Sequence, residues 1–280
     1  MSDAGGGQIA DDDEDAKIVG KEAQVLLHHL QRLPDLVRAR LQGALAETLL
    51  ERTIRVTTPR GPLTFVALGR TGAGRAVTML TKQPATITWI DRFAPGSTFW
   101  DVGANVGVYT LYAALRGDVD VVAFEPAAVN YFLLAANCEV SGLSERARCL
   151  LAGLGRASAI ADLAVSQFAA GKSFGFGGRK AEQFAGRQAA LVFSMDQAIA
   201  EYGLPVPNYI KIDVPVMTNE ILAGGTVTLS RPEVREVHIE ASEASSGGRR
   251  IIDTLAGHGL RLAGANAHGS SDLTFVRSAS

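Results

Sequence analysis

The sequence predicts an α/β fold in which helices cover both faces of a mostly parallel β-sheet. From Ser97 onward, short and nearly continuous apolar segments alternate with segments of helical periodicity, which is typical of parallel strands buried on both faces. A glycine-bearing turn joins the first of these strands to the next helix, as in open α/β sheets. The predicted strands cover residues 98–102, 119–124, 147–152, 209–214 and 236–241, with a last pair near 260 and 275, and the first helices cover 106–116 and 128–140.

Three segments are expected along the chain. Residues 1–15 contain a glycine triplet and an acidic run, and this composition favours a disordered tail. Residues 16–96 form a preface of two helices, separated at Pro34, and a β-hairpin with strands near 53–57 and 63–66. Residues 97–280 carry the α/β domain itself.

Composition excludes several classes of protein. The chain has 280 residues, with 27 Lys and Arg against 29 Asp and Glu for a formal net charge of −2. This balance lacks the basic excess that nucleic acids or anionic membranes attract. No apolar run approaches the roughly 18 residues of a membrane span, and the acidic N-terminus does not resemble a signal peptide. The two cysteines are too few for a disulfide framework, so we expect a cytoplasmic protein that binds neither nucleic acid nor membrane.

The most informative motif covers residues 99–110, which read FWDVGANVGVYT. Gly103 and Gly107 permit a tight turn and a close approach of backbone to ligand, and the following helix offers free N–H donors. The spacing is not that of a dinucleotide fingerprint, and Asp101 precedes it. A carboxylate there repels a pyrophosphate but suits a cationic ligand. The motif therefore favours S-adenosylmethionine, which carries an ammonium and a sulfonium, over a nicotinamide cofactor.

A second acid supports this interpretation. Glu125 ends the second predicted strand and Pro126 follows it, and an acid at this place in a βαβ unit accepts hydrogen bonds from ribose hydroxyls. Alone, the glycine pair is equally compatible with an ordinary strand-to-helix turn. Because Glu125 follows the second strand at the place where a ribose-binding acid is expected, we favour a cofactor site over an ordinary strand-to-helix turn.

Three stretches of the sequence resemble the FkbM family of S-adenosylmethionine-dependent methyltransferases. They are residues 101–110 (DVGANVGVYT), residues 123–126 (AFEP) with Asn130 and Asn137, and residues 209–214 (YIKIDV). Supporting similarity extends over about residues 53–276. The resemblance implies a Rossmann-like class I methyltransferase fold, a mostly parallel seven-stranded sheet flanked by helices in which the last strand is antiparallel.

The resemblance also implies an activity. Members of the family typically methylate hydroxyl groups of sugars or secondary metabolites, so a small-molecule or glycan hydroxyl is the expected acceptor. In the family, the glycine turn and the acid after the second strand bind the cofactor. The residues expected around S-adenosylmethionine are Asp101, Gly103, Ala104, Asn105, Gly107, Tyr109, Thr110, Glu125, Pro126 and Asn130.

Charged residues in two later strands are the catalytic candidates. Alternation places Lys211 and Asp213 on one face of their strand, and His238 and Glu240 on one face of the next. Asp213 is the first candidate for a base or acceptor-binding carboxylate, with Lys211 beside it. His238 is the second, because imidazole titrates near working pH. The alternative is an ion pair of Lys211 with Asp213 or Glu240 that only orders the sheet. No spacing typical of a metal site occurs, so no metal is expected.

One departure from the family pattern leaves other functions open. The family usually continues Lys-x-Asp-Val-Glu-Gly, whereas residues 211–216 read KIDVPV. The acid and the glycine are gone, and Pro215 fixes φ and removes a donor. A catalytically silent cofactor-binding interaction protein is therefore the second hypothesis, and a nicotinamide-dependent oxidoreductase is the third.

Two further features remain open in the sequence. The glycine-rich segment 171–186, with Phe174 and Phe176, is a candidate mobile loop that either closes over an acceptor or packs on the core. The amphipathic helices of residues 17–51 either cover the core or pair with a second chain, so a homodimer is one option.

Overall fold

The computed structural model describes residues 8–165, 171, 175–176, 186–214, 216–263 and 272–278, and for residues 8–19, 165 and 175–176 it describes the backbone alone. The chain forms two compact units, of which the first ends at Glu51 and the second begins at Arg52. Across the described residues, no helix has both the length and the apolar character needed to cross a membrane.

The first unit consists of the two predicted helices. Helix α1 covers Gln8–Gln31 and helix α2 covers Asp35–Leu50, and Pro34 occupies the N-cap position of α2. Proline is favoured near a helix start because its φ is already helical and it needs no donor. Helix α1 begins inside residues 1–15, for which the composition predicts disorder.

The second unit contains the predicted seven-stranded sheet, with strand order β12-β13-β11-β10-β3-β4-β5. Strand β13 is antiparallel to both of its neighbours, and the described pairs among the other strands are parallel. This order and direction confirm the fold class that the sequence predicts. The strands are β3 (Ser97–Val102), β4 (Val119–Phe124), β5 (Ala147–Leu150), β10 (Tyr209–Ile212), β11 (Glu236–Glu240), β12 (Leu260–Leu262) and β13 (Asp272–Arg277).

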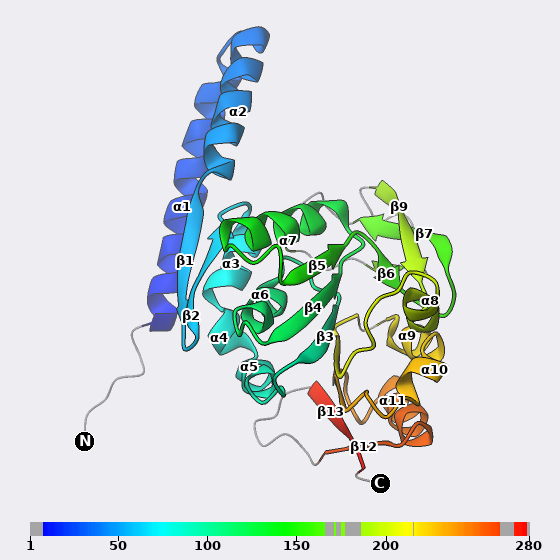
Figure 1. The fold of residues 1–280 in the computed structure, drawn as a ribbon. Helices are drawn as coiled ribbons and strands as arrows, with labels where there is room; N and C mark the ends of the chain where they lie inside the picture. The colour runs from blue at the N-terminus through cyan, green and yellow to red at the C-terminus, as the bar shows by residue number, and fades with distance from the viewer. Residues whose placement is uncertain are drawn as a thin grey trace, which may run out of the picture. The chain divides into compact units, whose positions relative to one another are not determined.

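Helices cover both faces of this sheet (Figure 1). Phe99 and Tyr209 pack with the helices α5 (Pro84–Asp91), α6 (Val108–Ala114) and α7 (Ala128–Val140). Trp100 and Ile210, one residue further along the same strands, pack with the opposite layer. That layer consists of α8 (Met195–Ala200), α9 (Thr218–Ala223), α10 (Thr226–Leu229) and α11 (Ser246–Gly257). Alternation along each strand therefore supplies two separate cores.

The hairpin and the short helices after it pack as part of the sheet's own core. They are β1 (Thr53–Thr58), β2 (Gly61–Val66), α3 (Arg70–Val77) and α4 (Met79–Lys82). Phe65 and Met79 are buried in the same cluster as Phe99. Asn137 of α7 fastens the hairpin, because its Oδ1 accepts a hydrogen bond from the Val66 N–H at 2.7 Å. The packing therefore places the break between units at residue 51, rather than between residues 96 and 97.

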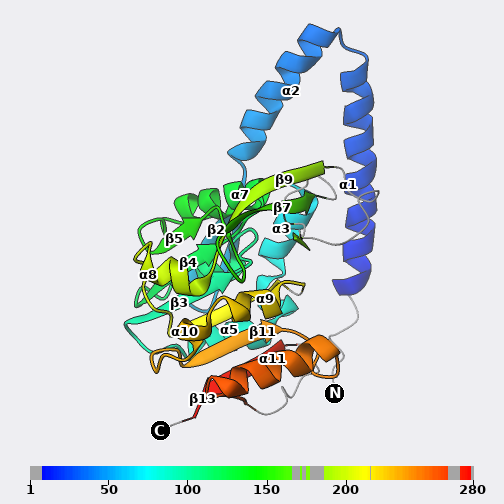
Figure 2. The ribbon, with the colours of Figure 1, turned by 90° about the vertical axis from the view of Figure 1, so that its right-hand side faces the viewer.

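A second, smaller sheet was not predicted from the sequence. It has the strand order β6-β9-β7-β8, and Figures 1 and 2 show it at the end of the unit away from β13. Phe174 and most of segment 171–186 lie outside the described residues, as does the Phe176 side chain, so both alternatives for this loop, closure over an acceptor and packing on the core, concern residues that the structure does not describe. The strands are β6 (Gly153–Leu154), β7 (Ala159–Val165), β8 (Gly175–Phe176) and β9 (Gly186–Phe193).

Candidate active site

The glycine turn after β3 lies against the end of β10. Gly103 has φ of +84°, and a Cβ added there would lie 2.7 Å from the carbonyl oxygen of Asp213. The N–H groups of Gly103 and Ala104 both donate to the Phe124 carbonyl at the end of β4, at 3.0 and 3.1 Å. Because three strand ends converge on this residue, its place accepts only glycine.

Glu125 binds the backbone of the same turn. Its carboxylate accepts a hydrogen bond from the Asn105 N–H at 2.8 Å and another from the Ala127 N–H at 2.9 Å. Asn105 has φ of +54°, a left-handed conformation that Asn adopts more readily than most residues. Burial raises the pKa of Glu125 to about 7, although these backbone hydrogen bonds act in the opposite direction. The Asn130 side chain also donates to this carboxylate, so of its roughly four acceptor positions about one remains for a further donor.

Two adjoining pockets open at these strand ends. The first has a volume of about 180 Å³ and the second about 130 Å³. Arg75, Asp213 and Glu240 line both pockets and mark where they meet. The first is lined by Arg75, Val102, Gly103, Asn105, Phe124, Glu125, Pro126, Asn130, Gly153, Leu154, Asp213, Val214 and Glu240. The second is lined by Arg75, Met79, Lys82, Gln83, Val108, Tyr109, Asp213 and Glu240.

Asp101 lies behind the pockets and lines neither of them. Its side chain is fully buried, and Oδ2 accepts a hydrogen bond from the Thr110 hydroxyl at 2.7 Å. Oδ1 has no hydrogen-bond partner in the part of the chain that the structure describes, and Lys211 Nζ is 3.9 Å away. Burial raises the pKa of Asp101, while the charge of Lys211 opposes that rise. The carboxylate therefore keeps an unused acceptor atom beside a cation.

Lys211 and Asp213 form an ion pair, which the sequence analysis gave as the alternative to a catalytic role for these residues. Lys211 is 3% exposed, and its Nζ is 3.2 Å from Asp213 Oδ2 and 4.9 Å from the centre of the Tyr109 ring. Burial lowers the pKa of Lys211, but the charges of Asp213 and Asp101 more than offset this, so the ammonium stays protonated. Burial raises the pKa of Asp213, yet Lys211 and a hydrogen bond with Glu240 bring it well below its usual range.

His238 lies in the core between β13 and α5. Its ring stacks on Trp89 with centroids 4.8 Å apart. Nε2 lies 3.2 Å from the Thr86 hydroxyl and Nδ1 lies 2.9 Å from the Thr274 hydroxyl. Burial lowers the pKa of His238 to about 3, and the charge of Lys211 adds to the effect. With both nitrogens engaged and the ring lining neither pocket, His238 has a packing role in this geometry.

The predicted cofactor residues fall into three groups. Gly103, Asn105, Glu125, Pro126 and Asn130 line the first pocket, and Tyr109 lines the second. The residues that line neither pocket are Asp101, Ala104, Gly107 and Thr110.

Gly107 serves packing rather than ligand approach. A Cβ there would lie 2.5 Å from Cδ1 of Leu134 and 2.9 Å from Cδ1 of Leu111. The turn therefore uses its second glycine to bring α6 against α7.

Sequence reasoning missed two side chains that line both pockets. Arg75 comes from α3, a short helix with no recognisable motif, and its Nε donates to the Gly171 carbonyl at 2.6 Å. Glu240 ends β11. The alternation of polar residues in β11 puts Glu240 on the same face as His238, but the pairing register of β10 and β11 is needed to bring Glu240 close to Asp213. A signal for Glu240 existed in the sequence, whereas none identified Arg75.

The model of the methyltransferase FkbM domain matches residues 101–262, which is more than half of the chain. The chain belongs to the FkbM methyltransferase family. This confirms the resemblance drawn from the motifs, and it makes the protein an S-adenosylmethionine-dependent methyltransferase. The 31-O-demethyl-FK506 methyltransferase FkbM of Streptomyces tacrolimicus is 30% identical over 193 residues, covering 60% of this chain and 74% of the relative.

Solved structures similar to this FkbM-family chain include two methyltransferases. A methyltransferase dependent on S-adenosylmethionine from Agrobacterium tumefaciens aligns with a TM-score of 0.46 and 9% identity, covering 82% of this chain and 72% of that one. The precorrin-6y C5,15-methyltransferase of Geobacter metallireducens aligns with a TM-score of 0.45 and 13% identity, covering 70% of this chain and 87% of that one.

The chemistry of the site fits the family's cofactor. Glu125 lines the first pocket and supplies an acceptor for hydroxyl donors. Asp101 Oδ1, which has no hydrogen-bond partner in the described chain, is a buried acceptor atom behind that pocket. Arg75 supplies a cation at the junction of the pockets. Gly103 and Asn105 of the turn line the first pocket, so the turn faces a ligand bound there. Among the described residues, no group of three or more His, Cys, Asp or Glu side chains is arranged for a metal ion.

Proposed function

We propose that the protein is an O-methyltransferase that transfers a methyl group from S-adenosylmethionine to a hydroxyl of a small molecule, such as a secondary metabolite or a sugar. The observation that carries the proposal is the pair of carboxyl groups, Asp213 and Glu240, where the two pockets meet. A hydroxyl acceptor needs its proton removed as the new bond forms. The relative's name, 31-O-demethyl-FK506 methyltransferase, supports oxygen as the atom methylated.

The first pocket is the proposed cofactor site. Glu125 accepts a hydrogen bond from a ribose hydroxyl at its remaining acceptor position, while its bonds to the backbone and to Asn130 keep the carboxylate in place. The turn at Gly103 and Asn105 presents backbone to the same ligand. Arg75 is the cation suited to the carboxylate of the methionine part. Asp101, with its unused Oδ1, adds negative potential behind the site for the cationic end of the cofactor.

The second pocket is the proposed acceptor site. Its lining combines Asp213 and Glu240 with the side chains of Gln83, Lys82 and Tyr109, so it favours a polar acceptor over a purely apolar one. When bound, S-adenosylmethionine supplies an electrophilic methyl group on a positively charged sulfur. The protein's part is to hold the acceptor oxygen in line with that group, which is worth about 7–11 kcal/mol of the barrier. Removing the proton contributes a further factor of about 10² to 10⁴.

The experiment is methyl transfer from labelled S-adenosylmethionine to small molecules extracted from the cells that make this protein. We expect label in an extracted compound whose mass rises by one methyl group, in a bond that resists the mild base that cleaves methyl esters. Label on nitrogen, sulfur or a carboxyl group would contradict O-methylation.

A catalytically silent protein is the competing proposal. The family's acid and glycine are missing after Val214, at a point where Pro215 lies outside the described residues. Binding of S-adenosylhomocysteine without any transfer, across extracts that support transfer by an active family member, would favour the silent protein.

A further inference from the structure

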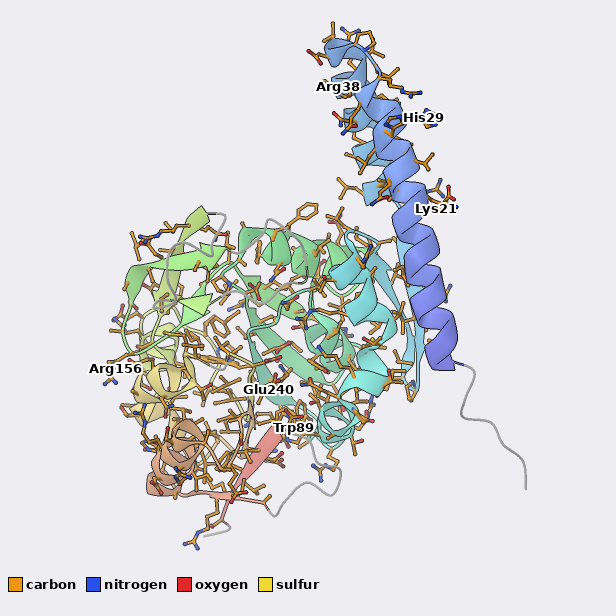
Figure 3. The ribbon with its side chains drawn as sticks, turned by 180° about the vertical axis from the view of Figure 1, so that it is seen from behind. Lys21, His29, Arg38, Trp89, Arg156 and Glu240 are labelled. Atoms are coloured by element: carbon orange, nitrogen blue, oxygen red, sulfur yellow. The ribbon has the colours of Figure 1, made fainter. Side chains whose placement is uncertain are left out.

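Strand register brings Glu240 to Asp213. Strands β10 and β11 are parallel, and Ile212 lies opposite Ile239, so the next residue of each strand emerges at the same edge of the sheet. Both carboxyl groups line the two pockets, and they interact, since each changes the pKa of the other. Glu240 lies well inside the outline of the α/β unit, whereas Arg156 lies at its margin (Figure 3).

The two carboxyl groups have unequal surroundings. Asp213 Oδ2 is 3.2 Å from the ammonium of Lys211, a side chain that is 3% exposed. An ion pair of this kind keeps a carboxylate ionised. When two such neighbouring carboxyl groups hold one proton between them, the proton therefore resides on Glu240, and Glu240 becomes ionised as the pH rises. This division of charge follows from the position of Lys211.

Other charges facing Glu240 act in both directions. Asp272 lies opposite Glu240 in the antiparallel pair of β11 and β13, and its charge, like that of Asp213, opposes ionisation of Glu240. Lys211 favours ionisation, as does the Arg75 guanidinium that lines the same pockets. The hydrogen bond with Asp213, partial burial and these acidic neighbours raise the pKa of Glu240 to about 7. A base with that pKa is matched to neutral pH.

We propose that Glu240 is the residue that takes the proton from the acceptor hydroxyl, and that Asp213, held by Lys211, positions it. The inference rests on the proposed O-methyl transfer. In the step, the hydroxyl oxygen bonds to the methyl carbon, the carbon–sulfur bond breaks and its electron pair stays on sulfur. The step starts from the form in which Glu240 is ionised, which becomes populated as the pH rises through about 7. The hydroxyl proton then moves to the Glu240 carboxylate, which later releases it to solvent. Asp213 is a poorer base because Lys211 stabilises its charged form.

The first test follows the carboxyl protonation directly and needs no acceptor. Infrared difference spectra of the full chain between pH 5 and 9 report the carbonyl stretch of protonated carboxyl groups. Two groups, Glu125 and Glu240, are expected to titrate near pH 7. Glu240→Gln should remove one of them, and Asp213→Asn should shift that one to lower pH because a negative neighbour is lost.

The matched control is Glu236→Gln, four residues earlier on β11 and outside both pockets, where the side chain accepts a hydrogen bond from the Trp89 ring N–H at 2.8 Å. It should leave both titrations unchanged. A spectrum of Glu240→Gln identical to that of the wild type would overturn the assignment of the proton to Glu240.

The second test uses methyl transfer once an acceptor has been identified. Glu240→Gln should lower kcat by about 10² to 10⁴ with little change in affinity for S-adenosylhomocysteine. Asp213→Asn should retain more activity and move the rising limb of the pH–rate profile to lower pH. A loss of this size in Asp213→Asn with a nearly active Glu240→Gln would overturn the proposal in favour of Asp213. If the wild type transfers no methyl group, the O-methyltransferase proposal fails, whereas the infrared result still decides the protonation of the pair.

Discussion

Glu125 and Glu240 both have a pKa near 7, for different physical reasons. Glu125 is 5% exposed, and desolvation raises its pKa against two backbone hydrogen bonds that favour its charged form. Glu240 is only partly buried, and the hydrogen bond with Asp213 is the largest influence on it. The first carboxyl group belongs to the proposed cofactor site and the second to the proposed proton transfer, so substitutions can separate the two.

Glu125→Gln tests the cofactor role. Ribose hydroxyls donate to the ionised carboxylate, so the wild type should bind S-adenosylhomocysteine more weakly as the pH falls through 7, approaching tenfold per pH unit (about 1.4 kcal/mol) if binding requires the charge. The variant should bind at least about tenfold more weakly at pH 8 and lose most of this pH dependence. Isothermal titration calorimetry at several pH values measures both effects.

Gln preserves the side chain's length and one carbonyl acceptor, so circular dichroism should show a folded variant. Glu125→Ala is a harsher change, because the N–H groups of Asn105 and Ala127 lose their acceptor at a cost of about 1–3 kcal/mol each. Unchanged affinity in the Gln variant would mean that the ribose lies elsewhere.

His238→Asn tests the packing role assigned to that ring. The native pKa of about 3 lies below the ordinary value of 6.5, so the unfolded chain binds a proton that the native chain excludes. The wild type should therefore lose stability as pH falls from 6.5 toward 3, by up to about 1.4 kcal/mol per pH unit. The Asn variant should lose this slope, and be less stable at neutral pH by about 1–3 kcal/mol from lost packing and hydrogen bonds. Urea denaturation across this range measures the difference.

Affinity for S-adenosylhomocysteine is the control for this variant, and we expect it to change less than twofold. A stable variant that binds the cofactor product normally but has lost methyl transfer would contradict a purely structural role and restore His238 as a candidate base.

At the scale of the elements, the glycine turn joins three parts of the fold. Gly103 brings β3 against the end of β10, and Gly107 brings α6 against α7. Asn137 adds a cross-link, since its side chain donates to the Val106 carbonyl at 2.8 Å and accepts from the hairpin. The motif that identifies the family thus fixes packing as well as the ligand pocket.

Gly107→Ala should be markedly destabilising. A left-handed conformation costs an L-residue about 1–2 kcal/mol, and the overlap of the new Cβ with Leu134 and Leu111 adds about 1–3 kcal/mol. Gly142→Ala is the matched control, because its φ is +68° and nothing lies within 4 Å of the added Cβ. Chemical denaturation of both variants should show a larger loss for Gly107. Equal losses would show that the contact with Leu134 relaxes freely.

The strands of the main sheet could be predicted from their sequence because each is a short apolar run between turn signals. The strands of the small sheet could not. In β7, the apolar Ile160 is 77% exposed, so the hydrophobic pattern there does not distinguish a buried face from an open one. The segment between β7 and β9 is rich in glycine and suggested a loop alone.

At the scale of the whole molecule, every residue that lines the two pockets lies after Arg52, in the second unit. A chain of residues 52–280 should therefore fold and bind S-adenosylhomocysteine within about threefold of the full chain, a difference below about 1 kcal/mol. Calorimetry with thermal unfolding of both chains measures this. A truncated chain that unfolds cooperatively but has lost binding would show that residues 1–51 contribute to the site.

Residues that line the first pocket were easier to identify in the sequence than the side chains where the two pockets meet. Gly103, Asn105 and Glu125 are close together in the chain, so one strand–turn–helix–strand motif defines them. Arg75 and Glu240 come from distant elements and meet only because the tertiary fold brings α3 and β11 to one edge of the sheet. Local patterns do not encode such proximity. His238, a catalytic candidate from the alternation of its strand, faces a buried layer in the structure, and its catalytic role stays a prediction that His238→Asn tests.

Calorimetric titration of the full chain with S-adenosylhomocysteine, and separately with NAD, decides which cofactor the first pocket binds. We expect micromolar binding of S-adenosylhomocysteine at one site per chain, at least tenfold weaker binding in Glu125→Gln, and no binding of NAD at the same concentrations. Binding of NAD alone, or binding of S-adenosylhomocysteine that Glu125→Gln leaves unchanged, would contradict the claim that the pocket beside Gly103 and Glu125 holds the methyl donor.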